Sequence, residues 1–186
     1  MLLDRGVGPD HPFYLPVRVT GQAFERVVFV TPLCAARMKG GPAVEEVLSA
    51  AGARDDVFTS AFLGDLSSLG KALSADGNVA QATDPAVDVL DITPVDHAVA
   101  GGQLEALRLL LDHAGRAFAP GVRALRTAAA RGDVAMVELL LVHGADTTRI
   151  GVGRWVLHRE LAPLLASRGA SIDPSGEWIG ASCTGN

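Results

Sequence analysis

Histidine side chains are the residues in this chain most able to bind a metal ion. His113 and His143 lie 30 residues apart, each near the end of a Leu-rich run, so a metal pair between them is conceivable. A structural role is the stronger interpretation, because histidines near a helix C-terminus can satisfy its terminal carbonyls. His97 lies in an Ala-rich run and is expected to be a core histidine or one that bonds a turn. The sequence therefore predicts no metal site.

The two cysteines could supply covalent chemistry. Cys34 and Cys183 are far apart in sequence and lack metal-ligand spacing, which favours a reducing compartment. Two alanines follow Cys34, so this residue is expected to be a small buried side chain rather than a nucleophile.

Other chemical motifs are weak. Gly151-Val152-Gly153 begins like a dinucleotide-binding fingerprint, but the sixth position of that pattern is Val156 and no strand is expected before it. Ser60 and Ser182 have no matched base or acid nearby in sequence. The sequence thus predicts no catalytic residue and no cofactor.

The elements that carry these residues repeat along the chain. Two segments, 97–113 and 127–143, align without gaps, and each reads as a short Ala-rich helix, a Gly turn and a Leu-rich helix. Similar patterns occur at 31–53, 56–69 and 161–170. The Leu-rich helices are apolar around most of their circumference and need neighbours on both sides, which stacked repeats supply.

Three stretches carry a family resemblance: Thr31-Pro32-Leu33, Thr93-Pro94-Val95 and the run from Val137 to Asp146. They resemble the ankyrin signature, T-P-L-H-x-A-A-x-x-G followed by V-x-L-L-L-x-x-G-A-D. The threonines can cap a helix start, and the prolines fit the first helical position. The resemblance implies an all-α repeat solenoid, an ankyrin-type helix-turn-helix stack with β-hairpin-like finger loops.

The repeats are unevenly spaced within one predicted domain, 1–186. The turn glycines Gly40, Gly64, Gly102 and Gly132 are 24, 38 and 30 residues apart, whereas a regular ankyrin unit is about 33 residues. Neither end offers a polar capping repeat, so the chain is either a fragment of a longer array or packs its ends against something, including a second copy. The predicted parts are a partial repeat 1–10, a finger 11–30, repeats at about 31–54, 55–78, 93–116, 123–146 and 152–173, and a partial repeat 174–186.

Two segments between helices are predicted to be extended. The β-prone runs Phe13–Thr20 and Ala23–Val30 flank Gly21-Gln22 and read as a β-hairpin. This hairpin is either an elongated finger packed on its own stack or an exposed apolar hairpin that meets a partner. The inserted segment 79–92 contains a brief alternation that could pair as a second extended finger.

The resemblance also implies where a partner would bind. In an ankyrin stack, the two positions before each turn glycine face the concave side, and here they include Ala100 and Gly101. An apolar centre with a charged rim would suit an interface. The alternative for Phe62 is that its side chain packs under the inserted segment 79–92. The predicted partner-binding residues are Met38, Lys39, Phe62, Leu63, Ala130 and Arg131 on that face, and Phe13, Tyr14 and Phe24 in the finger.

Composition narrows the class of function. A net charge of −5 without a basic cluster argues against nucleic-acid binding. No apolar run reaches the roughly 20 residues that span a bilayer, and the N-terminus lacks the features of a signal peptide, so a cytoplasmic location is expected. The ankyrin resemblance implies a non-catalytic protein–protein interaction scaffold that binds a partner through the concave face and the finger loops. The alternative is a regulatory or targeting segment of a larger enzyme whose catalytic part lies outside this chain.

Overall fold

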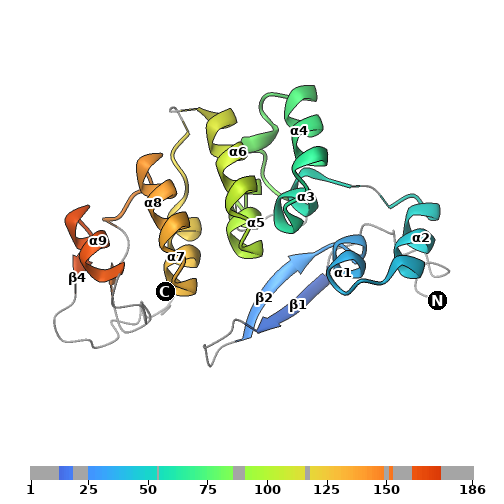
Figure 1. Cartoon of the computed structure of the whole chain (residues 1–186), viewed down its shortest axis with the longest axis horizontal. Helices are drawn as coiled ribbons and strands as arrows, with labels where there is room; N and C mark the ends of the chain where they lie inside the picture. The colour runs from blue at the N-terminus through green and yellow to red at the C-terminus, as the bar shows by residue number, and fades with distance from the viewer. Residues whose placement is uncertain are drawn as a thin grey trace, which may run out of the picture. The chain divides into compact units, whose positions relative to one another are not determined.

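The computed structural model describes residues 13–18, 25–53, 55–85, 91–115, 118–148, 151–152 and 161–172. The chain divides into two compact units, Met1–Phe118 and Ala119–Asn186, and each unit is described by itself. Figure 1 labels most of their helices and strands along the chain.

Consecutive helix pairs make up most of the described chain. Each pair is joined by a short turn, and the two helices of a pair pack on each other. The pairs in the first unit are α1 (Pro32–Met38) with α2 (Pro42–Ala50), α3 (Val57–Leu63) with α4 (Leu66–Ala75), and α5 (Pro94–Gly101) with α6 (Leu104–Ala114). The second unit holds α7 (Val122–Arg131) with α8 (Val134–Val142), then α9 (Leu161–Ser167). The predicted all-α repeat fold is confirmed.

Local sequence explains where the first helices of these pairs begin. Thr31 caps α1 by accepting a hydrogen bond from the backbone N–H of Cys34 at 3.2 Å. Thr93 and Asp96 form a reciprocal capping box at the start of α5. A proline follows each threonine at the first helical position, where no backbone N–H is needed. The caps predicted from the two threonine–proline pairs are confirmed.

Glycines end the first helices of successive pairs. Gly64 and Gly102 terminate α3 and α5 with φ of 75° and 74°, in the left-handed region that favours glycine. The chain then reverses within two residues into α4 and α6. These turns set the second helix of each pair against the first.

The closest helix packing in the first unit lies between α3 and α5. Figure 1 shows these helices side by side, with α4 and α6 also adjacent. A Cβ atom placed on Gly101 would lie 2.0 Å from the carbonyl oxygen of Phe62, so only glycine fits there. Ala61 and Ala98 have no exposed surface, and small side chains let the two backbones approach.

A β-hairpin precedes α1. Strand β1 (Phe13–Arg18) pairs antiparallel with β2 (Glu25–Val30), with Phe13 opposite Val30 and Arg18 opposite Glu25. The strands fall within the two predicted β-prone runs. Whether this hairpin packs on the stack or meets a partner stays a prediction.

The inserted segment differs from its prediction where the structure describes it. Val79–Gln81 forms a 3-10 turn, η2, rather than part of an extended finger. Ala80 is fully buried, and the turn packs against α4, α5 and α6, so burial of this short apolar stretch outweighs strand pairing. The backbone N–H of Asp84 donates to the carbonyl of Ile92 at 2.8 Å and closes the segment at its base. Residues 86–90 lie outside the described residues.

Short strands flank the last described helix of the second unit. Strand β3 (Gly151–Val152) pairs parallel with β4 (Ser171–Ile172), on either side of α9 in the sequence. The repeat predicted at 152–173 has only the stretch 153–158 in place of a proper first helix, and this stretch lies outside the described part of the chain.

Candidate interaction surface

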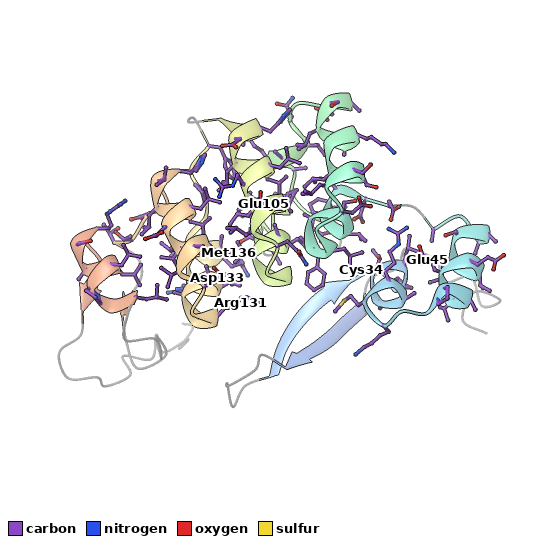
Figure 2. All side chains as sticks on the ribbon, viewed as in Figure 1. Cys34, Glu45, Glu105, Arg131, Asp133 and Met136 are labelled. Atoms are coloured by element: carbon purple, nitrogen blue, oxygen red, sulfur yellow. The ribbon has the colours of Figure 1, made fainter. Side chains whose placement is uncertain are left out.

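An apolar cluster joins the first helices of the first unit. Cys34 on α1 and Phe62 on α3 are its buried members, and Ala35, Met38, Leu63 and Ala100 pack against them. Figure 2 labels Cys34 on α1. The structure thus brings together Met38, Phe62 and Leu63, which the sequence assigned to one apolar centre.

Phe62 does not face outward as the interaction prediction requires. Its side chain is only 5% exposed, and it packs with Cys34 rather than under the inserted segment. The cause is the close approach of α3 and α5 together with α1, which encloses the ring. Phe62 therefore holds the first helices together, and direct contact with a partner does not fit its burial.

The neighbouring positions are more accessible. Met38 and Leu63 are half-buried, and Lys39, which follows α1, is exposed. This leaves a charged side chain beside a partly exposed apolar rim at the ends of α1 and α3. Partner binding by these three residues stays a prediction.

Ala130 and Arg131 end α7 in the second unit. Both are half-buried, and Figure 2 labels Arg131 beside the turn that leads to α8. Phe13 and Tyr14 lie on β1, opposite Val30 and Phe29. Phe24 lies outside the described residues, so the structure gives it no place.

Cys34 has the environment of a structural thiol. It is 1% exposed, and burial raises the pKa of its thiol to about 12, with the nearby Asp56 carboxylate acting in the same direction. Because the thiolate is the reactive form, this cysteine is unsuited to act as a nucleophile. The prediction that Cys34 is a small buried residue is confirmed.

A buried polar pair ties the inserted segment to α5. Nε2 of His97 lies 2.9 Å from Oδ2 of Asp84, and both residues are buried. The His97 ring also lies against Phe58 of α3, with ring centroids 5.4 Å apart. The expectation of a core histidine is confirmed, but its partner was missed. Asp84 lies in an irregular insertion, and no sequence periodicity links it to α5.

A second unpredicted contact centres on Arg37 of α1. Its Nε donates to Oε1 of Glu45 at 2.8 Å, and its two terminal nitrogens donate to the carboxylate of Asp55. The pKa of Arg37 is raised above its ordinary value, chiefly by the hydrogen bond to Glu45. One guanidinium thus joins α1 to α2 and to the segment leading into α3. Figure 2 shows Glu45 on the neighbouring helix.

Neither a metal-ligating cluster nor a membrane-spanning helix is found among the described residues. No group of three or more His, Cys, Asp or Glu side chains there could hold a metal ion. His113 lies in the last turn of α6, and His143 is the residue that follows α8. None of the described helices is long and apolar enough to cross a bilayer.

Comparison with known proteins identifies one segment. The family model described as ankyrin repeat matches residues 121–151, which contain α7, α8 and the segment after them. No curated protein matches the chain. The matched segment contains one of the three stretches that carried the resemblance in the sequence, the run from Val137 to Asp146. This match confirms an ankyrin repeat at residues 121–151 and, on a fold of repeated helix pairs, supports the resemblance of the chain to ankyrin repeat proteins.

Proposed function

We propose that the chain is a non-catalytic scaffold that binds a protein partner. The observation that carries the proposal is the ankyrin repeat at 121–151, because ankyrin repeats typically serve as protein–protein interaction modules. The alternative is a regulatory or targeting segment of a larger enzyme. It rests on the same repeat, and no other feature of the described residues favours it. A cytoplasmic location, in which Cys34 stays reduced, is part of this proposal.

The proposed contact surface in the first unit is the end of α1 and α3. Lys39 is exposed there, and Met38 and Leu63 form a partly exposed apolar rim over buried Phe62. Interfaces commonly combine such an apolar centre with a charged edge. Phe62 supports this surface from beneath, so its substitution would test folding rather than binding.

The test compares charge reversal at two exposed lysines. A partner is first identified by affinity capture with the full chain and mass spectrometry, and its affinity is then measured by isothermal titration calorimetry. Lys39→Glu lies on the proposed surface, whereas Lys71→Glu lies on α4, the second helix of its pair, and serves as the matched control. We expect Lys39→Glu to weaken binding about fivefold or more and Lys71→Glu to change it by less than about twofold.

Circular dichroism checks that both variants stay folded. Equal affinities for wild type, Lys39→Glu and a Met38→Glu variant would show that this surface does not bind the partner. A chain that captures no protein specifically would count against the scaffold function itself.

A further inference from the structure

The α1–α2 pair is joined to the other helices of the first unit mainly through α1. α3 packs closely on α5, and α4 packs on α6, whereas α1 packs much less on α3 and α2 packs mainly on α1. Val44 and Val47 of α2 are 55% and 50% exposed, so this helix keeps much of its apolar side accessible. Among the described helices of the unit, this pair therefore has the weakest attachment to its neighbours.

The pair also has a small apolar core of its own. The buried members of this core, with Ala53 packed against them, are Leu33, Ala36 and Leu48 from α1 and α2. They belong to a different cluster from Cys34 and Phe62, which join α1 to α3. A group of helices with its own core can separate from its neighbours without first losing its internal packing.

The described polar links from the pair toward α3 are weak ones. The hydroxyl oxygens of Thr31 and Thr59 lie 3.2 Å apart. The guanidinium of Arg37 donates to the carboxylate of Asp55, in the segment that leads into α3. The side chain of Asp55 is 35% exposed, and ion pairs at such accessible positions add little to stability. These links can therefore break while each group of helices stays folded.

We infer that the α1–α2 pair opens away from α3 as one body and that this opening takes apart the proposed contact surface. Met38 lies at the end of α1 and Leu63 at the end of α3, so the surface is complete only while the pair is closed. A partner that contacts both residues binds the closed form and shifts the population toward it. This coupling rests on the proposed function, whereas the opening itself does not.

Cys34 provides a reporter for the opening. It is 1% exposed in the closed form, where burial raises the pKa of its thiol to about 12. An accessible thiol has a pKa of about 8.5 and forms far more of the thiolate that alkylating reagents attack. Cys34 therefore reacts after α1 leaves α3. A Cys183→Ser substitution removes the other cysteine, so that only Cys34 is labelled.

The experiment measures how fast iodoacetamide alkylates Cys34 in the full Cys183→Ser chain, followed by mass spectrometry. The rate in buffer, divided by the rate in the urea-unfolded chain, gives the equilibrium constant for exposure. A matched Cys34→Ala/Val99→Cys/Cys183→Ser chain places the thiol at a fully buried position of α5. We expect the constant for Cys34 to be larger by about tenfold or more and to depend less on urea, because opening exposes less surface than unfolding of the unit.

The bond between Arg37 and Asp55 supplies a second comparison. Asp55→Asn removes the carboxylate and should speed the labelling of Cys34 about threefold. Glu46→Gln makes the same change of charge at an exposed position of α2 and should leave the rate within about 1.5-fold of the parent chain. The captured protein partner, at about ten times its Kd, should slow the labelling about tenfold.

Equal exposure constants and equal urea dependence for Cys34 and the Val99→Cys chain would overturn the opening, because α1 would then leave α3 only when the unit unfolds. Equal labelling rates for Asp55→Asn and Glu46→Gln would also contradict it. A bound partner that leaves the labelling of Cys34 unchanged would overturn the coupling to the contact surface. That last result would leave the scaffold function intact, which fails only if the chain captures no partner.

Discussion

The hydrogen bond between His97 and Asp84 fixes how the inserted segment meets α5. Both side chains are buried, and the N–H of Asp84 also donates to Ile92 across the base of the insertion. A buried imidazole that loses its partner must give up its hydration without compensation. Stability of the first unit should therefore depend on this pair more than on any exposed histidine.

His97→Ala should destabilise the chain by about 2 kcal/mol or more, because it removes packing against Phe58 and leaves Asp84 without this partner. His113→Ala, the same change at an exposed position of α6, should change stability by less than about 0.5 kcal/mol. Urea unfolding followed by circular dichroism compares the two. Equal midpoints for both variants would contradict a stabilising role for the buried pair.

At the scale of helices, the close contact between α3 and α5 depends on a glycine, which has no side chain. Gly101 lies within α5, and any Cβ there would overlap the backbone carbonyl of Phe62. Gly70 lies within α4 and would meet nothing within 4 Å on gaining a Cβ. Substitution by alanine is therefore expected to lower stability at Gly101 and to raise it at Gly70.

Gly101→Ala should lower the free energy of unfolding by about 2 kcal/mol or more, because α3 and α5 must move apart. Gly70→Ala should raise it by about 0.5–1 kcal/mol, because alanine favours a helix interior more than glycine does. Thermal unfolding of both variants checks the signs. A Gly101→Ala chain as stable as wild type would show that the packing of α3 on α5 is looser than the structure indicates.

Helix starts and turns could be predicted because their causes lie within a few residues. Thr31, Thr93 and Gly102 act on adjacent backbone groups, so the sequence contains the full interaction. The burial of Phe62 depends instead on the distance between α1, α3 and α5, which small residues such as Gly101 determine. The same holds for the Arg37 and Asp84 contacts, whose partners lie on other segments.

At the scale of the whole molecule, the accessible apolar surface of α2 bears on self-association. Val44 and Val47 are 55% and 50% exposed, although they lie on the same stripe of the helix as buried Leu48. α2 packs mainly on α1. Two large apolar side chains on one helix face favour contact with another apolar surface.

If two copies of the chain associate through α2, the sedimentation coefficient of wild type should rise with protein concentration in analytical ultracentrifugation. Val44→Lys/Val47→Lys should abolish this rise, because apposing two lysine-bearing faces brings like charges together. Val142→Lys, at an isolated valine on α8 that is 72% exposed, is the matched control and should behave as wild type. A wild-type chain that stays monomeric at every concentration would refute the association. If only the Val142→Lys control lost the rise of the sedimentation coefficient with concentration, the contact between copies would instead lie in the second unit.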